Sequence, residues 1–458
     1  MKARTIAAFL CLTACAEQDE RAPQQATPID AGQTASVTEQ ERALLLTLRY
    51  DDSPAPSDPS NRVADDPKAR SFGHALFFEK ALSGALLEHD NDGTSATLGM
   101  VFETGRVSCA GCHIPKDGFV DTRSPHTQIS LAAGWTQRRT PTLLEVAFNP
   151  VYNWDGRRDT LWNQALGVME SPAEFNSARL FVAQQVFHLY RDSYESIFGP
   201  LPPLDDTTRF PKLTADVAGC RAESTKQGQI HICHGKPGDG AEYDGMAKED
   251  QEAVTRVAVN VGKAMAAYIR QLRCGRSRFD DWLDGDATAL NESEQRGAAL
   301  FVGRGHCVDC HSGPRLTDGK FHNAGLSPAT VAVAFTDLGD RGAADGLNLA
   351  LQDPLNSRGT FSDGDRRVLP PAVDPSMLGA FRTPGLRCIA EQPSFMHTGQ
   401  FTSLERVVTF HNQGGDLAGY PGSSELKRLN LSGAEESDLV AFLRSLQGPG
   451  PSASLLDP

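Results

Sequence analysis

Two short motifs in this chain combine cysteines and a histidine at a spacing that suits one particular chemistry. The sequence CAGCH spans Cys109–His113, and the sequence CVDCH spans Cys307–His311. C-x-x-C-H is the signature of c-type haem attachment. Two thiols on one helical turn can add to the two vinyl groups of a haem, and the adjacent histidine can bind its iron from the same side. The motifs predict two covalently bound haem c groups, with thioether bonds from Cys109, Cys112, Cys307 and Cys310 and iron ligands from His113 and His311.

A redox-active dithiol and a zinc site are the chemical alternatives for these motifs. A thioredoxin-like dithiol normally follows a strand of a βαβ unit, and neither motif is preceded by a strand pattern. Zinc would need a fourth ligand for each Cys-Cys-His set, and the sequence supplies none at a fixed short spacing. Haem attachment is therefore the favoured interpretation.

The N-terminus resembles the signal of a bacterial lipoprotein. Lys2 and Arg4 precede the apolar run TIAAFLCL, and small residues lead to Cys15. This pattern predicts a lipoprotein signal peptide over residues 1–14 and lipidation of Cys15. A cytosolic start with a chance apolar patch is the alternative. Cleavage would leave a periplasmic protein held by acyl chains, and Ala16 after the cysteine favours the outer membrane.

Four further cysteines, Cys220, Cys233, Cys274 and Cys388, belong to neither motif. An even number in an oxidising compartment suits disulfides. Cys220 with Cys233 would close a short loop, and Cys274 with Cys388 would tie two distant segments. Three connectivities are possible.

The charge of the chain limits its partners. The formal net charge is −14, which argues against nucleic acid because nucleic acid binding needs clustered Lys and Arg. An acidic surface favours basic protein partners through electrostatic steering.

The elements that must position the two motifs are expected to be helices. The segment Glu252–Cys274 is apolar at helical spacing throughout, strand signals are scarce, and Pro and Gly punctuate long loops. Each motif follows a similar segment, and the second is preceded by a capped helix start at Asn291 and Glu294. We predict an all-α fold of two tandem cytochrome-like units with long loops. The expected boundaries are a flexible tether over 15–66, an N-terminal domain over 67–285 and a C-terminal domain over 286–448.

A helix with a histidine at the end of its apolar face follows in the C-terminal part. Thr402 and Glu405 form a possible capping box, and the apolar stripe of Leu404, Val407 and Val408 ends in His411. Such a histidine is more often a core residue than a metal ligand.

Several segments together resemble the bacterial di-haem cytochrome c peroxidases and their MauG-type relatives. The resemblance covers roughly residues 70–445 and rests on independent motifs, among them VSCAGCHIPKDGFVD, NWDGRRDTLWNQ, LFVGRGHCVDCHSGPRLTDGKFHNAGL, GAFRTPGLR and FMHTGQFTSLERVVTFHNQGG. It implies two c-type cytochrome domains whose haems face the domain interface. The N-terminal haem would react with peroxide, and the C-terminal haem would relay electrons.

The resemblance also assigns roles to individual residues. Trp154 matches the tryptophan between the two haems, and Gln164 and Glu174 match the distal pocket of the N-terminal haem. A carboxylate is useful there because cleavage of the O–O bond requires a proton to move from the inner to the outer peroxide oxygen. His411 matches the sixth ligand of the C-terminal haem, which reverses the preference for a core role.

Two departures from the family pattern matter. Many members close the N-terminal iron with a distal histidine, and Ala133 of LAAGW stands at the comparable position here; His126 is near but differently spaced. We therefore expect an open, five-coordinate iron at His113. The family's interdomain calcium uses an asparagine where this chain has Arg139, whose guanidinium has no acceptor atom. The pattern thus does not support calcium, and Arg139 could replace it electrostatically.

These features predict a peroxidase that reduces hydrogen peroxide to water. Its electrons would come from a small donor protein, a c-type cytochrome or cupredoxin. The alternatives are a MauG-like enzyme that oxidises a residue of a partner protein and a passive di-haem electron carrier. Because imidazole in place of thioether normally lowers a haem potential, His411 favours the MauG-like branch modestly.

Overall fold

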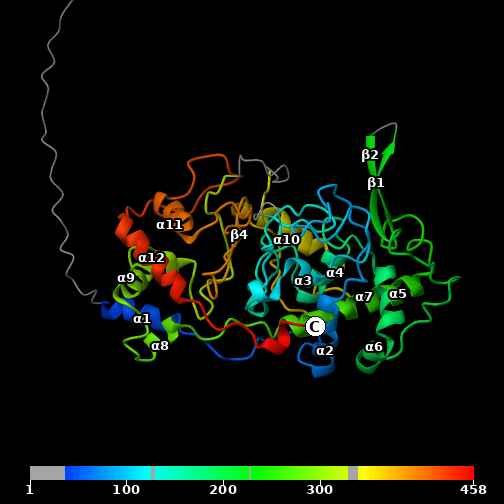
Figure 1. The fold of residues 1–458 in the computed structure, drawn as a ribbon, viewed down its shortest axis with the longest axis horizontal. Coiled ribbons are helices and arrows are strands. Elements are labelled where there is room, and N and C mark those ends of the chain that lie inside the picture. The colour runs from blue at the N-terminus through cyan, green and yellow to red at the C-terminus, as the bar shows by residue number, and fades with distance from the viewer. Residues whose placement is uncertain (1–36, 125–128, 226–227, 328–338) are drawn as a thin grey trace, which may run out of the picture. The chain divides into compact units, whose positions relative to one another are not determined.

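A computed structural model describes residues 37–458 except 125–128, 226–227 and 328–338 (Figure 1). The α-helices are α1 Glu39–Thr47, α2 Pro67–Phe78, α3 Cys109–Cys112, α4 Leu161–Met169, α5 Arg179–Leu189, α6 Arg191–Phe198, α7 Lys248–Ile269, α8 Arg278–Leu283, α9 Glu292–Val302, α10 Ala343–Gln352, α11 Leu404–Gln413 and α12 Gly433–Ser445. The strands are β1 Gly219–Thr225, β2 Gly228–His234, β3 Phe321–His322 and β4 Phe381–Arg382. The 3₁₀ turns are η1 Pro115–Asp117, η2 Val146–Phe148, η3 Cys307–Asp309, η4 Pro375–Met377 and η5 Ala453–Leu455. The prediction of a mostly helical chain with long loops is confirmed.

The β1–β2 hairpin is an element that the sequence pattern did not predict. The two strands pair antiparallel with Cys220 opposite Cys233, and these cysteines form a disulfide. The strand sequences GCRAEST and GQIHICH alternate between apolar and polar residues only over short runs within a Gly-rich segment, which is why they read as loop. An isolated hairpin is marginal in water, and the disulfide links its two strands.

The second disulfide joins Cys274 to Cys388 across 114 residues. Both suggested pairings are therefore confirmed in the structure. Among the described residues the four motif cysteines are not disulfide-bonded.

A first hydrophobic cluster is built around α7. This helix packs against α2, α4 and α5 and is buried along most of its length, as its apolar sequence predicts. Two glycines allow close helix contacts. A Cβ on Gly73 of α2 would lie 1.9 Å from the Ala264 carbonyl oxygen, and a Cβ on Gly262 would lie 2.3 Å from that of Trp162 on α4. This cluster supports the first motif.

A second hydrophobic cluster supports the other motif and involves α1, α8, α9, α11 and α12. Helix α9 packs against α12 and α1 (Figure 1). The predicted capping box of Asn291 and Glu294 is confirmed at the start of α9. Helix α11 begins one residue later than predicted, because the Ser403 hydroxyl rather than Thr402 caps it by accepting from the Arg406 N–H.

The described part of the predicted tether, residues 37–66, packs against both clusters. Leu45 and Leu48 are fully buried in the second cluster. Farther along, the Asn61 side chain donates to the Lys263 carbonyl of α7 at 3.0 Å, and the Trp162 indole donates to the Ser60 hydroxyl at 3.1 Å. Polar composition suggested a tether, but these long-range contacts give the segment fixed partners.

The predicted signal peptide and Cys15 lie outside the described residues. Within the described residues, no helix combines the length and apolar character needed to cross a membrane.

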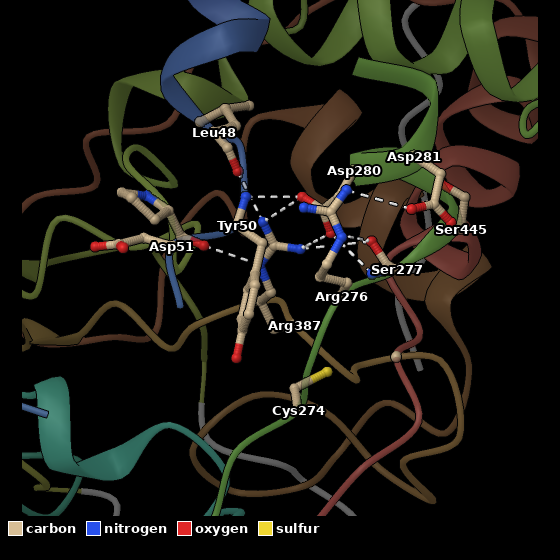
Figure 2. A network of polar contacts seen from close by, with 12 residues as sticks. Leu48, Tyr50, Asp51, Cys274, Arg276, Ser277, Asp280, Asp281, Arg387 and Ser445 are labelled. Atoms are coloured by element: carbon tan, nitrogen blue, oxygen red, sulfur yellow. Dashed lines mark hydrogen bonds and ion pairs between the residues drawn. The ribbon is translucent and has the colours of Figure 1, made fainter. Parts of the chain in front are cut away.

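A buried ion pair connects α8 to the segment that carries Cys388 (Figure 2). The Arg387 guanidinium donates to both carboxylate oxygens of Asp280 at 2.6 and 3.0 Å, and both side chains are almost fully buried. Asp280 also accepts from the Tyr50 N–H at 2.8 Å and from the Ser277 hydroxyl at 2.8 Å. One carboxylate therefore joins three segments that are distant in the sequence.

Replacing Asp280 by asparagine should destabilise the protein, because it leaves the Arg387 charge buried without its partner. We expect the free energy of unfolding, measured by urea denaturation, to fall by about 3 kcal/mol. Asp281→Asn is the matched control, since Asp281 is half exposed on the same helix, and it should change stability by less than about 0.5 kcal/mol. Equal stability of the two variants would contradict the role of the ion pair.

The same ion pair predicts a loss of stability in acid. Burial alone would raise the pKa of Asp280, but the hydrogen bonds and charge of Arg387, with those from Ser277, outweigh burial and hold the pKa below its ordinary value. The stabilisation is therefore complete above the pKa of an unfolded aspartate, about 3.9, and is lost as the pH falls through the lower folded pKa. Asp280→Asn should remove this part of the acid sensitivity.

Candidate functional site

The second C-x-x-C-H motif opens onto a large cavity. The cavity has a volume of about 780 Å³, within the range typical of cofactor sites. It is lined by residues from several separate segments, among them Cys307, Cys310 and His311 of the motif, His411 of α11, Trp154, Arg139 and Arg382. The structure thus brings three residues predicted from distant parts of the sequence, His311, His411 and Trp154, to one cavity.

The two histidines in this cavity are held in the same tautomer. The Nδ1 atom of His311 lies 3.0 Å from the Leu316 carbonyl oxygen, and that of His411 lies 2.8 Å from the Val407 carbonyl oxygen. A carbonyl can only accept, so Nδ1 carries the proton and Nε2 keeps its lone pair. This arrangement both satisfies a partly buried histidine and orients it as a metal ligand would be oriented.

Burial keeps both rings neutral at neutral pH. It lowers the pKa of His311 to about 4, against the opposing hydrogen bond to Leu316, and it lowers the pKa of His411, against the hydrogen bond to Val407. Neutral imidazole is the form that binds a metal. Leu404 and Val408 of the predicted stripe are buried, so the packing of α11 sets the position of His411.

The cysteines of both motifs do not resemble a reactive dithiol. Burial raises the pKa of Cys109, Cys112 and Cys307 to about 12 and that of Cys310 to about 11, whereas a redox dithiol needs a lowered pKa. Within the described residues there is also no group of three or more His, Cys, Asp or Glu that could hold a metal ion alone. The motif geometry disfavours zinc, while unreactive thiols and a neutral histidine beside a large cavity fit haem c.

The first motif has the same local design as the second. Cys109–Cys112 form the single turn of α3, and the Nδ1 atom of His113 lies 3.0 Å from the Phe119 carbonyl oxygen. Phe119 and Leu316, which supply the two carbonyls, both have left-handed backbone conformations, with φ of 61° and 50°. The sequence did not identify these two residues, because neither is a type that signals a positive φ.

Glu174 lies close to the first motif. The negative charge of Glu174 contributes to the raised pKa of both Cys109 and Cys112. Its backbone carbonyl accepts from the N–H of the fully buried Ala133 at 3.0 Å. Glu174 and Ala133, which the sequence resemblance predicts to lie at the same haem site, are therefore neighbours. Gln164 is partly buried on α4, and no described contact joins its side chain to Glu174.

The pKa of Glu174 is raised above its ordinary value by burial. Arg157, the Ser171 hydroxyl and Arg158 act in the opposite direction. Both arginines also have acidic partners, since Arg157 binds Asp155 at 3.2 Å and Arg158 binds Asp353 at 3.0 Å. A carboxyl group whose pKa is raised by desolvation, with cations nearby, is suited to proton transfer.

Trp154 is buried, with 6% of its surface exposed. Its indole N–H donates to the Arg139 carbonyl at 2.8 Å. The segment from Arg139 to Leu144 lines the cavity, and the Pro141 backbone carbonyl also accepts a hydrogen bond from His113. One short segment therefore lies between the cavity of the second motif and the histidine of the first.

The sequence departs from the family pattern at the distal histidine, for which His126 is the nearby candidate, and at the calcium site, where Arg139 replaces an asparagine. His126 lies outside the described residues. Arg139 is buried, with 6% exposed, and its guanidinium donates to the Gln392 side-chain oxygen. A buried donor-only group does not fit the ligand set of a calcium ion.

Comparison with known proteins gives a consistent result. Residues 67–218 match the family model of the di-haem cytochrome c peroxidases. The methylamine utilization protein MauG of Methylorubrum extorquens is 28% identical over 92% of this chain and 90% of its own length. The cytochrome-c peroxidase IdrP2 of Denitromonas iodatirespirans is 28% identical over 82% of this chain and 81% of its own length.

The fold has a solved counterpart. The crystal structure of the diheme peroxidase BthA from Burkholderia thailandensis E264 matches 88% of this chain and 92% of its own chain, with a TM-score of 0.57 at 22% identity. This similarity supports the fold. The predicted resemblance of the sequence to the di-haem peroxidase and MauG family is confirmed by the family and sequence matches.

Proposed function

This chain is related to the di-haem cytochrome c peroxidases and MauG proteins, and on this premise we propose that it reduces hydrogen peroxide to water as a di-haem c-type peroxidase. The observation that carries the proposal is the pair of neutral imidazoles, His311 and His411, at one cavity beside buried Trp154. The relatives support an oxidoreductase.

Two haems would be held in two tandem cytochrome-like domains. Cys109 and Cys112 would attach the first haem, with His113 as a ligand of its iron, and Cys307 and Cys310 would attach the second, with His311 and His411 as ligands of its iron. Haem iron when bound supplies the redox equivalents for cleavage of the peroxide O–O bond. The carbonyls of Phe119 and Leu316 orient the two proximal histidines by fixing their tautomers.

Glu174 would move the proton that the reaction requires. An ionised carboxylate oxygen of Glu174 accepts the proton of the inner peroxide oxygen and then gives it to the outer oxygen, which leaves as water. Arg157 favours the ionised form needed for the first of these steps. Gln164 would orient peroxide through its amide, as its position in the family motif suggests.

Trp154 would pass electrons between the two haem sites. Its indole lines the cavity of the second motif and is fixed by its hydrogen bond to the Arg139 carbonyl. The segment that includes Pro141 extends from this cavity to His113, so a continuous protein path links the two sites.

The iron at His113 should lack a sixth protein ligand in the fully oxidised enzyme. The methyl side chain of Ala133 has no ligating atom, and the backbone N–H of Ala133 donates to the Glu174 carbonyl. We therefore expect the absorption and electron paramagnetic resonance spectra of the oxidised protein to contain one high-spin and one low-spin haem. Two low-spin haems would contradict an open site and would imply that activation by reduction is needed.

The alternative function is oxidation of a residue in a partner protein. His411 favours it, because imidazole in place of methionine lowers the potential of the relay haem and makes a high-potential cytochrome a poor donor. Fast peroxide turnover with reduced cytochrome c or a cupredoxin supports the peroxidase. Slow turnover with covalent change in a partner supports the alternative, and absence of reaction with peroxide leaves a passive electron carrier.

We further propose that the protein works in the periplasm, anchored to the outer membrane through a lipid on Cys15. Labelling of cells with a radioactive fatty acid should mark the wild type. The Cys15→Ser variant should be unlabelled and released from the membrane fraction.

A further inference from the structure

Two neighbouring arginines beside Trp154 differ in how their charges are compensated. Arg138 binds Asp155 at 2.5 Å and Asp340 at 2.7 Å. Arg139, the next residue, has no carboxylate within ion-pair distance among the described residues and donates only to the neutral Gln392 side chain. Burial lowers the pKa of Arg139 to about 10, so it remains a cation at neutral pH. Its positive charge is buried without a counter-charge.

Arg382 of β4 is a second cation of this kind. It is 6% exposed, and its guanidinium makes only long contacts, to the Asn153 carbonyl at 3.5 Å and the Thr383 carbonyl at 3.4 Å. Burial lowers its pKa to about 10, with a small opposing effect from Tyr152. No carboxylate in the described part of the chain pairs with it.

Both arginines belong to the part of the cavity wall that holds Trp154. The Trp154 indole N–H donates to the Arg139 carbonyl at 2.8 Å, and the Arg382 N–H donates to the Trp154 carbonyl at 2.8 Å. The Arg139 N–H in turn donates to the His397 carbonyl at 2.9 Å, and the His397 ring stacks on Phe381 at 3.6 Å. These contacts hold the backbones of both arginines against Trp154, and both arginines line the cavity.

Buried charges in proteins are normally paired. A guanidinium binds carboxylates especially well because its fork of N–H donors matches the two oxygens. Two unpaired guanidiniums at one cavity therefore indicate a ligand that brings acid groups. A haem carries two such groups, its propionates.

We propose that Arg139 and Arg382 form a binding site for the two carboxylates of the haem in the second cavity. This inference rests on the proposed function, since it requires that haem. With such a site, the positive charge around Trp154 is balanced only when the haem is bound. Arg139 and Arg382 are thus positioning residues that raise the potential of the second haem, and the carboxylates of that haem would balance their charges beside the electron path.

The test uses purified, haem-loaded protein and four substitutions, Arg139→Gln, Arg382→Gln and the charge-retaining Arg139→Lys and Arg382→Lys. Arg341→Gln is the matched control, since Arg341 is exposed and pairs with the exposed Asp345. Haem content is measured first, and the midpoint potential of the haem at His311 is then measured by spectroelectrochemistry. Resonance Raman spectra report the propionate groups independently of potential and activity.

Loss of a nearby cation stabilises oxidised haem. In each Gln variant, the ratio of oxidised to reduced second haem at a fixed applied potential should therefore rise at least tenfold, which corresponds to a midpoint potential lower by 59 mV. The Lys variants should keep the potential but change the propionate bands, because they retain charge and lose the fork geometry. Should a Gln variant fail to fold, the Lys variant still tests the contact.

Unchanged potentials in Gln variants with full haem content, or propionate bands that change equally in Arg341→Gln, would overturn the carboxylate site. Absence of haem from the second motif in the wild type would instead overturn the proposed function.

Discussion

A His411→Met variant should carry its second haem at a potential about 0.2 V higher than the wild type, within the roughly 0.8 V that axial ligands span. Imidazole stabilises oxidised iron, whereas a thioether favours the reduced form. Methionine can reach the same position because α11 is fixed by the buried residues Leu404 and Val408. The wild-type geometry supports the exchange, since Nε2 of His411 is the atom that keeps a lone pair.

The potential is measured by spectroelectrochemical titration, and the spectrum reports the ligand directly. His188→Met is the control, because it makes the same chemical change at an exposed position on α5. It should leave both spectrum and potential unaltered. If His411→Met also left the spectrum and the potential unaltered, His411 would be a core residue held by the Val407 carbonyl and not a haem ligand.

A Glu174→Gln variant should lose peroxide turnover by about 10³-fold, or about 4 kcal/mol in activation free energy. Glutamine keeps the size of the side chain but cannot accept the peroxide proton. Haem content and the spectrum of the oxidised enzyme should be unchanged, because Glu174 is not a ligand of either iron.

The control is Glu252→Gln, an exposed position on α7, which should retain full turnover. Full activity in Glu174→Gln would mean that another group carries the proton. Equal loss in both variants would point to damage of the fold rather than to proton transfer.

The raised pKa of Glu174 also predicts the pH dependence of turnover. Burial favours the protonated carboxyl, and Arg157, Ser171 and Arg158 only partly oppose this. The base must be ionised, so turnover should rise with pH through the pKa of Glu174, above the value of about 4.3 for an ordinary glutamate. The Gln variant should lack this rise. A rise that persists in the variant would assign it to a different group.

The sequence predicted those features that depend on local order along the chain. Cys109–His113 and Cys307–His311 indicate haem attachment because thiols and imidazole act within one helical turn, whatever surrounds them. The long apolar helix α7 and the capping box of α9 were likewise predicted, since periodicity and caps are local signals. The disulfide pairs were suggested as one of three connectivities, and the structure selects among them.

Other features depend on neighbours that are distant in the chain. Polar composition predicted a tether up to residue 66, but Leu45 and Leu48 find a core. The β1–β2 hairpin was missed because the apolar alternation in its strands is short and lies within a Gly-rich segment. The carbonyls of Phe119 and Leu316 that orient the two histidines could not be read from residue type, since a positive φ there is set by the surrounding fold.

The sequence by itself therefore determined which groups can bond to haem, because covalent attachment needs only a short spacing. The tertiary structure decided which charges are compensated. Arg138 and Arg139 are identical neighbours in sequence, yet one meets two carboxylates and the other meets none among the described residues. Pairing of charges depends on segments far apart in the chain, so only the folded arrangement reveals the unpaired cations beside Trp154.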